Sequence, residues 1–246
     1  MRFTIGRKLG LGFGILLFLV VAVFVLAYNT TKDNLDTLSV GIDENEFISN
    51  YSGPAIADLQ RLRDNMEEAK DLTLRWATVA SISEHQDKRR LLKIQDTIIP
   101  MDIKPSLMNN VDSLSNVVRD SIEAVFREID ALFIEYQEIQ QILPNLASYD
   151  SVYNKFFAAS IIAPDGIMMT NARQVSSRLD RLIIEVHKEN DERTVRMNEN
   201  FELAENAGTY LIRAIFYGLI FIPVVVLIVA VLTARAITRP VRELKG

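Results

Sequence analysis

Apolar and polar positions follow two different patterns along the chain: two long uncharged stretches near its ends, and heptad-like spacing between them. The first stretch, residues 9–31, and the second, residues 214–234, contain no charged side chain. Roughly 20 apolar residues at about 1.5 Å each cross a hydrocarbon core of about 30 Å. Each stretch therefore predicts a membrane-spanning helix. A cleaved signal peptide is the alternative for the first, but its apolar run exceeds the usual apolar region of about 7–15 residues.

Between these stretches, apolar residues recur every three or four positions. The clearest seam runs from Val118 to Leu143 in alternating steps of four and three, and Pro144 follows it. This spacing is typical of an amphipathic helix that packs in coiled-coil fashion, and proline lacks the backbone donor that would continue it. A shorter amphipathic piece covers residues 91–99. The three long seams consist of Val118, Ile122, Val125, Ile129, Leu132, Tyr136, Ile139 and Leu143; Leu59, Leu62, Met66, Ala69, Thr73, Trp76 and Ala80; and Ala172, Val175, Leu179, Leu182 and Val186.

Turn-forming residues divide the middle of the chain into four predicted helices. Residues 52–54 (Ser-Gly-Pro) predict a break or kink within the first helix, and residues 83–87 predict a polar turn after it. Residues 100–110 and 144–151 predict the next two connections, and residues 164–166 (Pro-Asp-Gly) interrupt the last helix. Strand signals are nearly absent. The sequence therefore predicts an all-α membrane protein in which two transmembrane helices flank an extracytoplasmic antiparallel four-helix bundle.

Charge sets the expected orientation. The N-terminal tail, residues 1–8, and the C-terminal segment, residues 235–246, each carry a net charge of +3, whereas residues 32–213 carry −11, which together give the net −5 of the chain. Short flanks rich in Lys and Arg stay in the cytoplasm. We therefore expect both termini to be cytoplasmic and residues 32–213 to form an extracytoplasmic sensor domain. An acidic exterior also argues against nucleic acid as a partner, because nucleic acid binds basic surfaces.

Composition and motifs remove several kinds of chemistry. The chain has 246 residues, no cysteine, and only two histidines, His85 and His187. A disulfide framework, a thiolate or His-rich metal site and a cysteine nucleophile are therefore excluded. No P-loop, G-x-S-x-G, H-E-x-x-H or EF-hand spacing occurs. We expect no catalytic residue, metal or cofactor within the chain.

Three segments resemble a known family. Residues 7–14 (RKLGLGFG), followed by a long apolar run, look like the start of bacterial transmembrane four-helix-bundle sensory receptors, the methyl-accepting chemotaxis proteins and related HAMP-containing sensors. Residues 54–59 (PAIADL) resemble the kinked first sensor helix of that family. Residues 236–244 (AITRPVREL) are similar to the opening of a HAMP domain, the cytoplasmic relay after the second span; a basic flank that contains a proline is the alternative. A HAMP domain needs two helices, so we expect the chain to be a truncated input half.

The resemblance implies a homodimer in the bacterial inner membrane that senses a small-molecule ligand or a periplasmic binding protein. It also implies cytoplasmic signalling partners, reached through an output domain beyond residue 246. Related receptors hold anionic ligands with arginines on the first and last sensor helices. Solvated or ion-paired arginine and core tryptophan are the alternatives here. The candidate ligand-binding residues are Arg61, Arg75, Trp76, Arg178 and Arg181.

Two prolines are candidates for signal relay. Pro223 lies inside the second span and removes one backbone hydrogen bond, which predicts a kink that is either a hinge or simply tolerated. Pro240 opens the expected HAMP segment. If two copies pair along the last sensor helix, cysteines at positions 172, 175, 179 and 182 would crosslink in membranes. The alternative functions are the input half of a sensor histidine kinase, cyclase or phosphatase, and a non-sensory membrane scaffold.

Overall fold

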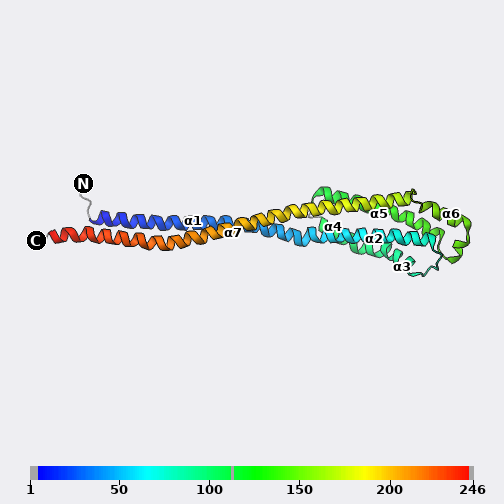
Figure 1. Ribbon diagram of the computed structural model, residues 1–246, viewed down its shortest axis with the longest axis horizontal. Helices are drawn as coiled ribbons and strands as arrows, with labels where there is room; N and C mark the ends of the chain where they lie inside the picture. The colour runs from blue at the N-terminus through cyan, green and yellow to red at the C-terminus, as the bar shows by residue number, and fades with distance from the viewer. Residues whose placement is uncertain (1–4, 112–113, 244–246) are drawn as a thin grey trace. The chain divides into compact units, whose positions relative to one another are not determined.

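Every regular element in the described part of the chain is a helix, as the sequence predicts (Figure 1). The computed structural model describes residues 5–111 and 114–243. The elements are α1 (Ile5–Phe47), η1 (Ile48–Ser52), α2 (Gly53–Thr78), α3 (Gln86–Lys93), η2 (Ile94–Ile103), α4 (Lys104–Val111), α5 (Asn116–Ile142), η3 (Leu146–Asp150), α6 (Val152–Ile161) and α7 (Ile167–Glu243). By contacts the chain forms two units: unit 1, of Met1–Asp43 and Arg196–Gly246, and unit 2, of Glu44–Val195. Helices α1 and α7 contribute to both.

Two helices are long and apolar enough to cross a membrane. One apolar stretch lies in the helical run Gly12–Thr78 and the other in Ile167–Leu232, and neither stretch is buried within the protein. Large side chains such as Phe18, Phe24 and Leu227 are mostly exposed. A continuous apolar surface of this extent needs a lipid or protein environment. The predicted membrane-spanning helices are thus confirmed in their length and composition, which indicates membrane association.

Helices α1 and α7 lie against each other within unit 1. A Cβ atom at Gly12 would come 2.8 Å from Cγ1 of Val229, and one at Gly41 would come 3.1 Å from Cε1 of Phe201. Both positions carry glycine, which lets neighbouring helices approach closely. Any larger residue at Gly12 would require the valine side chain or one of the helices to move.

Unit 2 contains one apolar core, to which α2, the run of α3, η2 and α4, helix α5 and the first part of α7 all contribute. The predicted seams supply this core. All eight residues of the Val118–Leu143 seam are buried, and Leu59 and Leu179 from the other two seams are fully buried. Burial of each large aliphatic side chain stabilises the fold by about 1.5–3 kcal/mol. Ala80 is the exception, because α2 already ends at Thr78 and the residue is exposed.

Three prolines that predicted helix breaks lie in or beside π-helical turns instead. The turn η1 comes just before Pro54, while η2 contains Pro100 and is followed by Pro105. Proline cannot donate to the carbonyl four residues back and clashes with it, and the wider π turn accommodates both effects. The predicted connection at residues 100–110 was therefore wrong, since helix α4 runs to Val111.

Two of the other predicted breaks lie where the sequence placed them, whereas the turn predicted at residues 83–87 lies a few residues earlier, because α2 ends at Thr78 and α3 begins at Gln86. Helix α5 ends at Ile142, just before Pro144, and residues 162–166 separate α6 from α7. Serine caps start two of the helices: Oγ of Ser115 accepts a hydrogen bond from the backbone N–H of Val118, and Ser151 caps α6 in the same way. Such caps satisfy backbone donors that have no partner inside the helix.

Candidate functional site

The five candidate ligand-binding residues lie at several places in unit 2 rather than in one pocket. Arg75 lines a groove between α2 and α3, and Arg178 and Arg181 line a second groove between α5 and α7. Arg61 and Trp76 line neither of these grooves.

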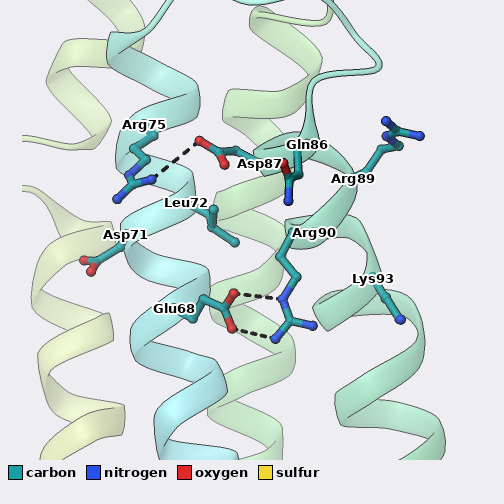
Figure 2. A pocket seen from close by; sticks show the side chains of 9 residues that line it. All are labelled: Glu68, Asp71, Leu72, Arg75, Gln86, Asp87, Arg89, Arg90 and Lys93. Carbon is teal, nitrogen blue, oxygen red and sulfur yellow. Dashed lines mark hydrogen bonds and ion pairs between the residues drawn. The ribbon is translucent and has the colours of Figure 1, made fainter.

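The α2–α3 groove encloses about 790 Å³ and is rich in charge (Figure 2). Helix α2 supplies Asp71 and Arg75, whereas Arg89 and Lys93 extend from α3 and point away from α2. The lining contains four cations and three carboxylates, so a small excess of positive charge remains. The lining residues are Glu68, Asp71, Leu72, Arg75, Gln86, Asp87, Arg89, Arg90 and Lys93.

Two ion pairs of unequal strength bridge this groove. Arg90 donates from Nε and Nη2 to the two carboxylate oxygens of Glu68, at 2.8 and 2.7 Å. This bidentate pair lowers the pKa of Glu68 and raises the pKa of Arg90. Nη1 of Arg75, by contrast, lies 3.7 Å from Oδ2 of Asp87, which is too far for a hydrogen bond. The Arg75 side chain is 64% exposed and is therefore accessible to a small anion.

The α5–α7 groove encloses about 450 Å³ and is electrically balanced. Nη1 of Arg178 lies 2.7 Å from Oε1 of Glu128, and Nε of Arg181 donates to the carbonyl of Ser177 within its own helix. Asp120 and Glu185 line the same groove, so two carboxylates face its two arginines. The groove has no excess positive charge with which to attract an anion.

Arg61 and Trp76 make contacts within the chain. The Arg61 guanidinium donates to Asp102 at 2.6 Å and to Asp58 at 3.2 Å, which joins α2 to η2. The hydrogen bond to Asp102 is the main cause of the raised pKa of Arg61. Trp76 is buried, and its indole N–H donates to the carbonyl of Leu143 at 2.8 Å. Arg61 is therefore ion-paired and Trp76 lies in the core, which are the structural alternatives to ligand binding for these two residues.

A buried lysine beside Trp76 was not predicted. Lys88 is 1% exposed, and its Nζ lies 4.7 Å from the centroid of the Trp76 ring and 5.2 Å from that of Tyr149. The ammonium donates to the carbonyls of Ser81 and Leu143 at 3.2 and 3.3 Å. Burial lowers the pKa of Lys88. Ring faces and carbonyl dipoles stabilise this cation, since no carboxylate pairs with it in the described part of the chain.

The Trp76–Lys88–Tyr149 cluster fastens three segments together. The Tyr149 hydroxyl donates to the carbonyl of Trp76 at 2.5 Å, so η3 is bound to the end of α2. Lys88, near the start of α3, contacts the Trp76 ring and so joins α3 to the same end of α2. Arg75 and Asp87 are sequence neighbours of Trp76 and Lys88, so the cluster positions the loosely paired residues of the α2–α3 groove.

A second set of polar groups, most of them only partly buried, joins α7 to α2 and α5. Glu67 accepts hydrogen bonds from Lys70 and Ser176. Nδ2 of Asn171 donates to Oε1 of Glu135 at 2.6 Å, and burial raises the pKa of Glu135. The hydroxyl of Tyr136 is buried and has no hydrogen-bond partner among the described residues, and burial raises its pKa. Polar contacts within a core set the register of one helix against another.

No protein-family model, curated protein or solved structure matches the chain. The resemblance to chemoreceptors therefore stays a prediction.

Helix α7 runs through both candidate relay positions. It continues as one helix past Pro223, whose ring is exposed, and Pro240 lies in its last turns with a side chain outside the described residues. The last-helix seam at positions 172, 175, 179 and 182 is buried in the core of unit 2. These side chains pack within the chain, and the pairing of two copies stays a prediction.

Proposed function

We propose that the chain is the input part of a transmembrane receptor that senses a ligand or partner with unit 2 and passes the change along α7. The continuity of α7 over 77 residues is the observation that supports this most strongly. Its first part supplies Leu179 and Val186 to the core of unit 2, and its later part is the second apolar helix. A packing change in the core is therefore connected to the apolar segment by helix alone.

In this proposal the ligand acts at the α2–α3 groove. An anionic group that binds Arg75 competes with Asp87 for the guanidinium, and so weakens the contact that joins α2 to α3 at this point. A ligand changes a protein only by binding two of its states with different affinity. Close-packed cores switch between discrete arrangements instead of deforming smoothly, which favours helix shifts of about 1–2 Å.

The proposal also includes the arrangement of the helices in unit 2, the number of copies and the orientation in the membrane. The helices of unit 2 form an antiparallel four-helix bundle outside the bacterial inner membrane, two copies act together, and a HAMP relay starts near Pro240 on the cytoplasmic side. The charge pattern supports this orientation, because the flanks of the apolar stretches are basic and residues 32–213 are strongly acidic. The output domain lies beyond residue 246 in this proposal.

A disulfide assay on the full chain in membrane vesicles tests the relay. Cysteines replace Gly12 and Val229, whose close approach in unit 1 suits disulfide formation. Leu179→Ala in the core of unit 2 is expected to change the rate of disulfide formation about threefold, as energetic coupling between sites of 0.5–2 kcal/mol implies. Ile184→Ala, an exposed position of the same helix, is the matched control and should leave the rate unchanged. A lowered melting temperature of Leu179→Ala would show that the core of unit 2 is loosened. If the rate of disulfide formation between positions 12 and 229 is nevertheless unchanged, the relay is contradicted.

A further inference from the structure

His85 caps helix α3 with a ring nitrogen that accepts a hydrogen bond. The backbone N–H of Asp87 donates to Nδ1 of His85 at 3.3 Å, which satisfies a donor that has no partner inside the helix. A neutral imidazole has one acceptor nitrogen, whereas both nitrogens of the protonated ring are donors. Protonation of His85 at Nδ1 therefore sets one donor against another and breaks this cap.

The carboxylate of Asp87 lies beside the same ring nitrogen. Oδ2 of Asp87 is 4.0 Å from Nδ1 of His85 and 3.7 Å from Nη1 of Arg75, and both distances are too long for a hydrogen bond. Figure 2 shows the Arg75 side of this arrangement. One carboxylate oxygen is thus shared loosely by two side chains. Protonated His85 gains a donor and a positive charge, and it then competes with Arg75 for Asp87.

We propose that protonation of His85 draws the Asp87 carboxylate away from Arg75, so that the α2–α3 groove binds anions more tightly in mildly acidic medium. This inference rests on the proposed function, in which an anionic ligand at that groove competes with Asp87 for Arg75. A proton and an anionic ligand then weaken the same contact between α2 and α3. Histidine is the side chain whose charge ordinarily changes between about pH 5 and 8.

The charged groups around His85 favour Asp87 as the partner of the protonated ring. Arg75 and Lys88 are cations, and like charges oppose a further positive charge on the imidazole. Asp87 is the one carboxylate that lines the small cavity beside His85 in the described part of the chain, since Glu84, the preceding residue, does not line it. The cavity is lined by Arg75, Trp76, Val79, Ser81, His85, Asp87 and Lys88.

The fluorescence of Trp76 measures the exchange without any ligand. The chain contains one tryptophan and two histidines, and Trp76 lines the same cavity as His85. For the full chain in detergent micelles we expect the emission of Trp76 to change between about pH 5 and 8. His187→Gln is the matched control and should retain this transition, because His187 is exposed on α7.

Replacement of His85 by asparagine should abolish the transition. Asparagine keeps a side-chain acceptor suited to the first position of a helix, and it takes up no proton in this range. Helix α3 should therefore stay folded in His85→Asn, and circular dichroism checks this. A transition that persists in His85→Asn would overturn the proposal.

Sulfate binding tests the consequence for the groove, since the charge of sulfate does not change in this pH range. Calorimetric titration should show sulfate binding about threefold more tightly at about pH 5.5 than at about pH 7.5, the effect expected of one exposed ion pair. Asp87→Asn frees Arg75 at either pH. This variant should bind sulfate at about pH 7.5 as tightly as the unchanged chain does at about pH 5.5, because the net charge of residues 85 and 87 is zero in both cases.

The coupling must also hold in the opposite direction. If the proton favours sulfate threefold, sulfate favours the proton by the same factor, because linkage between two binding sites is reciprocal. Saturating sulfate should therefore raise the midpoint of the Trp76 transition by about half a pH unit, relative to chloride at the same ionic strength. In His85→Asn sulfate should bind equally at both pH values.

Two outcomes separate this inference from the proposed function. Equal sulfate binding at both pH values in the unchanged chain, with weaker binding in Arg75→Gln, would overturn the inference and leave the groove as the proposed ligand site. Sulfate binding that Arg75→Gln does not weaken would remove the groove from the proposed function, and the inference would fall with it.

Discussion

Replacement of Trp76 by alanine is expected to lower the free energy of unfolding by about 3–5 kcal/mol, the usual cost of removing a buried tryptophan. The indole ring is buried, donates to the carbonyl of Leu143, and lies 4.7 Å from Nζ of Lys88. Its removal leaves a cavity and also takes one ring face away from a buried ammonium that has no ion pair among residues 5–111 and 114–243. Denaturant unfolding of the full chain in micelles, followed by circular dichroism, measures the loss.

Two further variants identify the cause of that loss. Trp76→Phe keeps a ring over Lys88 and removes the indole N–H, so it should cost about 1–2 kcal/mol, the effect of one hydrogen bond and some volume. Lys88→Met removes the charge and keeps most of the side-chain length. The double variant Trp76→Ala/Lys88→Met should lose less stability than the sum of the single variants, because no buried charge is left without its ring. Strict additivity would contradict a role for the cation–π contact.

Two arginines in the apolar part of α7 are expected to prevent its insertion. Val224 and Leu227 are exposed in the protein, so Val224→Arg/Leu227→Arg causes no clash within the fold and acts only through the membrane. Each arginine at the centre of a span costs about 2.5–3.5 kcal/mol, so the pair costs roughly 5–7 kcal/mol. A cysteine at Ala234 should then become reactive to a membrane-impermeant maleimide added from outside the cell.

The matched control places the same two charges outside the uncharged stretch. Leu203 and Tyr210 are also exposed and lie earlier on α7. Leu203→Arg/Tyr210→Arg should leave the cysteine at position 234 protected. If both double variants leave it protected, or both expose it, the second apolar stretch does not span the membrane in the way proposed here.

The helical architecture was largely predictable because it depends on local pattern. The Val118–Leu143 seam presents an apolar residue at each required position, and all eight are buried. The uncharged stretches need no tertiary information, since their length alone matches a bilayer. The connection at residues 100–110 failed because the rule for proline assumes an α-helical ladder, and η2 accommodates Pro100 in a π-helical turn instead.

The candidate site was less predictable because its contacts join residues far apart in the chain. Arg61 is paired by Asp102, which lies 41 residues away. Lys88 begins a run of three basic residues that suggests a solvated surface, and its burial depends on Trp76 and Tyr149. One signal was available: Lys88 precedes Leu91 by three positions and Leu92 by four, so it falls on the apolar side of its helix.

The sidedness of two single cysteines tests the central claim most directly, namely that unit 2 and the end of α7 lie on opposite sides of a membrane. Ser160→Cys in unit 2 and Ala234→Cys at the end of the second apolar stretch are introduced separately into the full chain in intact cells. The account predicts that a membrane-impermeant maleimide labels position 160 and reaches position 234 only after the cells are opened. Labelling of both positions from outside, or of neither before lysis, would contradict it.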